Sequence, residues 1–309
     1  MFSRLLSAPA VLAGISLLVS LGGCNDPAAV PERGTVMLAQ GSIRYYGRPV
    51  TLGNGIARTY VMVDRENSEL PLEVGVALSD GTTDGLPDGP IATHHSSDMR
   101  GGHAPENIQL LELPEHNPTP YRFVELDWNP RGHEPAGIYD LPHFDFHFYT
   151  VSQATRASIL PSDPQFAVKA ASLPASEFRP PFYVDAATAA GGIPAALVTV
   201  PMMGLHWVDV RSPELQLLVG NPAGYQPFTR TLFIGSWDGR FIFSEPMITL
   251  AYLLDKRSST DPAVQDETIP IPTAEDYSPS GFYPAAYRIA YDRGAREFLV
   301  GLTQLGGHE

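Results

Sequence analysis

One stretch near the middle of the chain alternates between aromatic and polar side chains. Phe144, Phe146 and Phe148 hold every second position, and His143, Asp145, His147 and Tyr149 hold the positions between them. Successive side chains of a β-strand point to opposite faces, so the pattern predicts a strand with a buried aromatic face and a polar face. A helix would instead stack His143 and His147 one turn apart, the usual helical spacing of zinc ligands. The phenylalanines and the preceding Pro142 favour the strand.

Alternating or apolar segments bounded by turn residues recur along the chain and predict further strands. They cover residues 43–46, 57–63, 72–78, 107–113, 121–128, 285–291 and 296–304. Residues 229–236 and 240–245 flank Asp238-Gly239, a pair typical of tight turns, and predict a hairpin. Ser152 predicts the N-cap of a short helix over residues 153–160. The elements together predict a mainly β fold: a single antiparallel β-rich domain over residues 34–309, a barrel or a sandwich, with a few short helices.

Four segments show no clear period. Residues 79–105 contain repeated Asp-Gly pairs and several histidines. Asp-Gly pairs form turns without a bound ion, so this segment is predicted to be a loop. Residues 161–196 are rich in proline and alanine and predict an irregular connection, long enough to cover a site. Residues 255–280 predict a surface loop, and residues 247–254 continue either as a strand or as a helix.

Composition and charge narrow the class of protein. Hydrophobic residues make up 43% of the chain and charged residues 17%, a balance typical of a folded domain rather than a disordered chain. The formal net charge of −14 disfavours nucleic acid and anionic lipid as partners of the folded body.

The N-terminal residues have the pattern of an export signal. Arg4 precedes a short apolar run that is followed by Leu21-Gly22-Gly23-Cys24, which looks like a bacterial lipobox. We therefore expect residues 1–23 to be a lipoprotein signal peptide, Cys24 to carry the lipid, and residues 24–33 to form a tether. This predicts a protein anchored to a membrane of the bacterial cell envelope and facing the periplasm. Cys24 is the single cysteine, so we expect no disulfides.

The polar face of residues 143–149 provides candidate metal ligands. His143 and His147 are about 13 Å apart at their Cα atoms in a strand, too far for both to bind one ion easily. A pair two residues apart, either His143 with Asp145 or Asp145 with His147, is easier, and it requires ligands from elsewhere. The remaining candidate ligands are His206, in a predicted extended piece over residues 205–209, and Glu245, expected on the same strand face as Phe241 and Phe243.

A ligand set of histidines and carboxylates suits zinc, manganese or non-haem iron. His133, Glu134 and Tyr149 lie close in sequence to the polar face and are candidate outer-shell groups, although a loop in which His133 hydrogen-bonds the backbone is the alternative. The order His143-x-Asp145 followed by His206 also matches the facial triad of iron-dependent oxygenases. The arginine expected to bind an oxoacid there is not convincingly placed.

Three blocks of the sequence resemble a known family. Residues 128–149, the run Pro201-Met202-Met203-Gly204-Leu205-His206-Trp207-Val208-Asp209 and residues 233–249 are similar to the blocks of an uncharacterised bacterial domain family of exported proteins and lipoproteins. The resemblance covers roughly residues 35–255 and implies an envelope protein, without adding a reaction.

Two functions compete at this point. The favoured one is a non-catalytic binding or structural role, in which His143, Asp145, His147 and His206 form a buried hydrogen-bond network that orders the core. The alternative is a metal-binding protein or metalloenzyme that uses the same cluster with Glu245. A serine or cysteine hydrolase is disfavoured because no Gly-x-Ser-x-Gly motif is present, while a carboxylate-pair glycosidase stays open.

Overall fold

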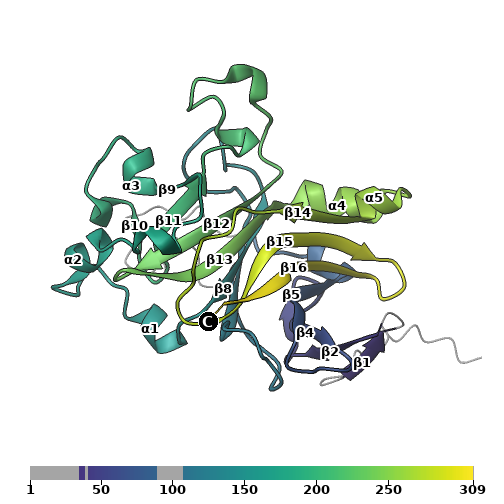
Figure 1. Cartoon of the computed structure of the whole chain (residues 1–309). Coiled ribbons are helices and arrows are strands. Elements are labelled where there is room, and N and C mark those ends of the chain that lie inside the picture. The colour runs from purple at the N-terminus through teal and green to yellow at the C-terminus, as the bar shows by residue number, and fades with distance from the viewer. Residues whose placement is uncertain (1–34, 39–40, 89–106, 309) are drawn as a thin grey trace, which may run out of the picture. The chain divides into compact units, whose positions relative to one another are not determined.

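The computed structural model describes residues 35–38, 41–88 and 107–308, which fall in one compact unit spanning residues 32–309. The predicted signal peptide, Cys24, the predicted tether and residues 89–106, with all three histidines of the predicted 79–105 loop, lie outside the described residues. The fold is mainly β, as predicted, and consists of two antiparallel sheets (Figure 1). Within the described residues neither sheet closes into a barrel, so the fold is sandwich-like.

The first sheet has the order β1-β2-β4-β5-β16-β15-β14, with β3 paired to β4. Its strands are β1 (Thr35–Leu38), β2 (Ser42–Tyr46), β3 (Val50–Leu52), β4 (Gly55–Asp64), β5 (Pro71–Ser79), β14 (Asp266–Pro270), β15 (Gly281–Asp292) and β16 (Glu297–His308). The second sheet has the order β10-β11-β12-β13-β8-β7-β6, with β9 paired to β11. Its strands are β6 (Ile108–Glu112), β7 (Phe123–Asn129), β8 (His143–Tyr149), β9 (Tyr183–Asp185), β10 (Thr199–Val200), β11 (Gly204–Asp209), β12 (Arg230–Trp237) and β13 (Arg240–Thr249).

The helices are short and lie in the connections. The α-helices are α1 (Gln153–Ala157), α2 (Phe166–Ala171), α3 (Ala186–Ala189), α4 (Leu250–Ser258) and α5 (Pro262–Gln265). The 3-10 helices are η1 (Asp80–Thr83), η3 (Ser176–Phe178), η4 (Ala195–Leu197), η5 (Pro213–Leu215) and η6 (Pro222–Gly224). In Figure 1, α1, α2 and α3 lie on the side of β11–β13, and α4 and α5 lie along β14 and β15.

The main core lies between the two sheets. It joins Val61 and Val300 of the first sheet to Phe144, Phe146 and Phe148 of β8, which are fully buried. The aromatic face predicted for residues 143–149 therefore packs on the core, as expected. Burying each of these side chains contributes about 1.5–3 kcal/mol, so they fix the register of β8 and hold its polar face on the other side of the sheet.

Several local predictions are confirmed. The hairpin β12–β13 turns at Asp238 and Gly239, both with positive φ, as a two-residue turn of this kind requires. Ser152 caps α1 by accepting a hydrogen bond from the Thr155 backbone N–H, although the helix ends at Ala157 rather than at residue 160. Residues 247–254 contain both alternatives: β13 ends at Thr249, whose side chain caps α4.

Two predictions of irregular structure are wrong. Residues 161–196 contain α2, η3, β9, α3 and η4, and residues 255–280 contain the end of α4, α5 and the strand β14. The elements are too short to show a period, and β14 is an edge strand with alternating exposed and half-buried residues. Lys256 is buried because its ammonium group binds the Glu267 carboxylate 2.8 Å away, a long-range pairing that a composition argument cannot anticipate.

The predicted face of β13 needs one correction. A β-bulge at Gly235/Ser236 pairs Gly235 with Phe243 but Ser236 with Phe241, so β13 contains an extra residue there. Phe241 packs against the main core, whereas Phe243 lies on the opposite face with Tyr149. Glu245 therefore shares its face with Phe243 and not, as predicted, with both phenylalanines.

Candidate metal centre

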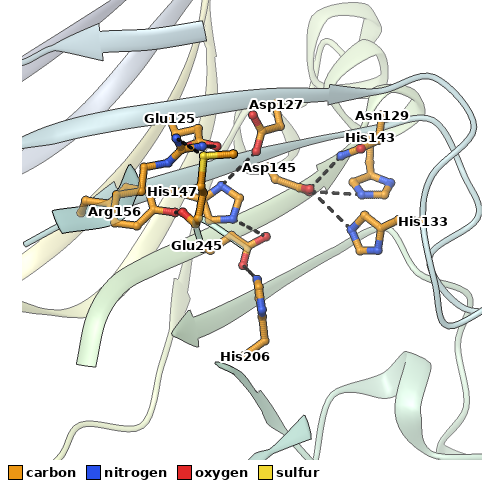
Figure 2. A network of polar contacts seen from close by, with 12 residues as sticks. Glu125, Asp127, Asn129, His133, His143, Asp145, His147, Arg156, His206 and Glu245 are labelled. Carbon is orange, nitrogen blue, oxygen red and sulfur yellow. Dashed lines mark hydrogen bonds and ion pairs between the residues drawn. The ribbon is translucent and has the colours of Figure 1, made fainter. Parts of the chain in front are cut away.

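The polar residues of β8 belong to a buried polar strip on the face of the second sheet that points away from the main core. The antiparallel register places Glu125 opposite His147, Asp127 opposite Asp145 and Asn129 opposite His143. On the other side of β8, β13 pairs Ser244 with Phe148 and Met247 with Asp145, which places Glu245 next to His147. Figure 2 shows the polar side chains of β7 and β8 together with Glu245 of β13, and His206 reaching in from β11.

Two apolar clusters on the same face enclose this strip. One contains Phe123, Tyr149, Met203 and Phe243, and the other contains Tyr139, Leu215, Phe228, Phe233 and Met247. Their members come partly from the connections that follow β7, β8 and β11, so these connections cover the sheet. As a result Glu125, Asp127, Asp145 and Glu245 are all buried. Buried charges are costly unless they are paired, so the neighbours of each carboxylate show how its charge is compensated.

His147, His206 and Glu245 form the first of two triads. The Nε2 atom of His147 lies 3.3 Å from Glu245 Oε1, and the Nε2 atom of His206 lies 3.4 Å from Glu245 Oε2 (Figure 2). One ligand atom from each residue lies within 4.8 Å of the other two. The His206 side chain is 15% exposed while the other two are buried, so the triad has an edge toward solvent. The three residues can hold a metal ion.

Asp127 backs the first triad. Its Oδ2 atom lies 3.4 Å from His147 Nδ1, the ring nitrogen that points away from Glu245. A carboxylate behind a ligating imidazole is a common outer-shell arrangement, because it orients the ring and raises its basicity. Within the described residues neither oxygen of Asp127 accepts a hydrogen bond of good geometry.

His133, His143 and Asp145 form the second triad. The Nε2 atom of His143 lies 3.1 Å from Asp145 Oδ1, and the Nε2 atom of His133 lies 3.5 Å from Asp145 Oδ2. The Asn129 amide donates to Asp145 Oδ2 at 2.7 Å and orients the carboxylate. These ligand atoms also lie within 4.8 Å of one another, and the two triads share no residue.

Among the described residues, one arginine enters the strip. Arg156 of α1 donates to the Glu125 carboxylate and is itself buried. Tyr149 stacks over His147 with ring centroids 5.9 Å apart, and its hydroxyl donates to the Met202 carbonyl oxygen at 3.3 Å. Arg156 therefore compensates Glu125, and the other three buried carboxylates face imidazoles.

The pKa values follow this arrangement. Burial, together with repulsion from Glu125 and Asp145, raises the pKa of Asp127 well above its ordinary value. Burial and repulsion from Asp145 and Asp127 likewise raise the pKa of Glu245. Burial alone would raise the pKa of Asp145, but its contacts with His143 and His133 hold it well below its usual range. Burial would lower the pKa of His133, yet contact with Asp145 raises it.

The structure divides the ligands predicted from the sequence. It places His143 and Asp145 in one triad, and His147, His206 and Glu245 in the other. His133, expected in the outer shell, is a member of a triad, whereas exposed Glu134 contributes its carbonyl oxygen, 2.7 Å from His133 Nδ1. Tyr149 contacts His147 through its ring, next to the first triad.

Sequence reasoning missed four residues of the strip. They are Glu125, Asp127 and Asn129 of β7 and Arg156 of α1. The signal for the first three was present, because they alternate with Val124, Leu126 and Trp128 in and directly after the predicted strand of residues 121–128. That alternation matches the pattern of residues 143–149 and marks the polar face of a neighbouring strand.

Comparisons with known proteins add nothing to this geometry. No protein-family model, curated protein or solved structure matches the chain. The resemblance to the family of exported proteins therefore stays a prediction. In the part of the chain that the structure describes, no helix is long and apolar enough to cross a membrane.

A cavity of about 290 Å³ is lined in part by residues of the main core. Its lining includes the aromatic residues Tyr121, Tyr183, Phe241 and Tyr283. Phe243 also lines it and packs against the rings of His147 and His206, with centroids 5.0 and 5.2 Å away. The triad residues do not line this cavity, so it is a neighbour of the polar strip and not part of it.

Proposed function

We propose that the protein is a metal-binding lipoprotein of the bacterial cell envelope, with a divalent transition ion held by His147, His206 and Glu245. The observation that carries the proposal is the pair of nitrogen–oxygen distances in the first triad. Ligands about 2.1 Å from a tetrahedral ion lie about 3.4 Å from one another. His147 Nε2 lies 3.3 Å from Glu245 Oε1 and His206 Nε2 lies 3.4 Å from Glu245 Oε2, so each nitrogen is at about that separation from one carboxylate oxygen. Charge-assisted hydrogen bonds between the same groups would be about 2.7–2.9 Å long.

The chemistry of the residues supports the same proposal. Two imidazoles and a carboxylate suit zinc, iron and manganese, and three protein ligands leave coordination positions for water or a substrate. His147, His206 and Glu245 come from β8, β11 and β13, three strands of one sheet, so their backbones are held rigidly. The non-catalytic network expected from the sequence involves the same residues, and metal analysis decides between the two.

The test is metal analysis of the full-length protein, purified in detergent and supplied separately with zinc, manganese and ferrous iron. His206→Ala and Glu245→Gln should each weaken binding at the first triad by more than roughly 100-fold, because even outer-shell partners are worth about 10–100-fold. His308→Ala, a half-buried imidazole on β16 of the other sheet, is the matched control and should bind like the wild type. A folded protein that takes up none of the three metals would instead support the metal-free network.

The anchor is a separate part of the proposal. It is supported by Leu21-Gly22-Gly23-Cys24, which ends a short apolar run. Expression of the Cys24→Ser variant in bacteria fed a labelled fatty acid should give protein without label, while the wild type is labelled. Equal labelling of the two proteins would contradict the lipid anchor without affecting the metal proposal.

A further inference from the structure

The second triad has a feature that points to a ligand of its own: the proton positions on its two histidines are fixed by backbone carbonyls. The Nδ1 atom of His143 lies 2.6 Å from the Leu141 carbonyl oxygen, and the Nδ1 atom of His133 lies 2.7 Å from the Glu134 carbonyl oxygen. A carbonyl oxygen can only accept a hydrogen bond, so Nδ1 must carry the proton in both rings. Each neutral ring then presents the lone pair of Nε2.

Both lone pairs face one carboxylate. His143 Nε2 and Asp145 Oδ1 are 3.1 Å apart, and within the described residues neither atom makes a hydrogen bond of good geometry. The contact thus has the length of a hydrogen bond without its direction. Two acceptors at this distance repel unless a positive charge lies between them. The distances of 3.1 Å to Asp145 Oδ1 and 3.5 Å to Asp145 Oδ2 also lie close to the separation of about 3.4 Å expected between two ligands of a tetrahedral ion.

The surroundings hold these atoms in place. Asn129 binds Asp145 from the neighbouring strand, and the backbone N–H of His133 donates to the Tyr139 carbonyl oxygen at 3.1 Å. The His143 ring packs edge-on against Phe228, with centroids 5.4 Å apart. The His133 side chain is 29% exposed, whereas those of His143 and Asp145 are buried, so an ion has a route from solvent.

We propose that His133, His143 and Asp145 bind a second divalent transition ion, so that the chain carries two separate metal sites. The alternative that the geometry allows is a pair of protonated imidazoles on one carboxylate. Zinc distinguishes the two alternatives, because a bound ion would take the place of the protons on Nε2 and bind the two Nε2 atoms directly. The second site rests on its own residues and stands or falls separately from the site at His147, His206 and Glu245.

The test is zinc stoichiometry of the full-length protein, measured by equilibrium dialysis with zinc alone. The wild type should bind two equivalents, and His133→Ala and His206→Ala should bind one each. His133 is the chosen position because it lies partly exposed in a loop, so its removal threatens folding least. The His133→Ala/His206→Ala double variant should bind none, and His308→Ala should bind two.

The other outcomes separate the two proposals. One equivalent in the wild type that survives His133→Ala but is lost in His206→Ala would overturn the second site and keep the first. One equivalent lost in His133→Ala but retained in His206→Ala would do the reverse. Proton–nitrogen NMR of the imidazoles provides a measurement without variants. Zinc should shift Nε2 of His133 and His143 while Nδ1 keeps its proton, and doubly protonated rings that zinc leaves unchanged would overturn the second site.

Discussion

At the scale of single residues, the polar group on one side of each imidazole decides what the other side can do. The backbone carbonyls behind His133 and His143, and the Asp127 carboxylate behind His147, leave Nε2 directed at a carboxylate in each case. Such backing groups fix ring orientation and tautomer, which is why they contribute to metal affinity without touching the metal.

Asp127 provides the residue-scale prediction. Asp127→Asn keeps the shape of the side chain but removes its charge, so the His147 ring should become less basic. We expect zinc affinity at the first triad to fall about 10–100-fold, with affinity at the second triad unchanged, as measured by competition with a chelator. Glu112→Gln, an exposed carboxylate on β6 of the same sheet, is the control. Unchanged affinity in Asp127→Asn would show that this carboxylate does not support the site.

At the scale of elements, the sequence was sufficient to predict a strand or a turn where its pattern is local. The alternation of residues 143–149 fixed both faces of β8, and the Asp-Gly turn fixed the hairpin β12–β13. The spacing of about 13 Å between His143 and His147 already indicated that they would not share an ion. The grouping of the ligands into two triads could not be predicted from the sequence, because it depends on the pairing of β7 and β13 with β8.

Two further features explain why the candidate site was only partly predictable. The bulge at Gly235/Ser236 changes which side chains of β13 share a face with Glu245, and an alternation count cannot include an extra residue that it does not see. His133 reaches Asp145 from the loop after β7, whose path is fixed by contacts such as the His133–Tyr139 backbone hydrogen bond. Long-range pairing, rather than local propensity, thus assembles both triads.

At the scale of the whole molecule, the buried strip couples metal binding to stability. Without a cation, Asp127 and Glu245 are buried among other carboxylates, and their pKa values are raised. A bound divalent ion would favour the charged forms that burial disfavours. The polar strip should therefore weaken the metal-free fold at neutral pH and strengthen the fold that holds metal.

This gives a prediction for pH. Groups with raised folded-state pKa values bind more protons in the native state, so the stability they contribute falls as pH rises from the ordinary carboxyl range, about pH 4, through their folded pKa values. The raised pKa of His133 likewise lowers the stability of the protein as pH rises above about 6.5. The lowered pKa of Asp145 gives a contribution that is already complete above about pH 4 and stays constant at higher pH.

The free energy of unfolding of the metal-free protein should therefore decrease as pH rises above the ordinary carboxyl range, about pH 4, as measured by urea denaturation with a chelator present. Saturating zinc should reverse the trend, because its ligands bind better when deprotonated. Glu245→Gln should flatten the metal-free profile. A metal-free protein that becomes more stable with rising pH would contradict this assignment of charges.

The central claim is that an ion binds between His147, His206 and Glu245. The most direct measurement is anomalous X-ray scattering from crystals of the zinc-loaded protein, collected on both sides of the zinc absorption edge. The account predicts an anomalous peak about 2.0–2.2 Å from the two Nε2 atoms and a Glu245 oxygen. Direct hydrogen bonds between these side chains, with no anomalous peak among them, would contradict it.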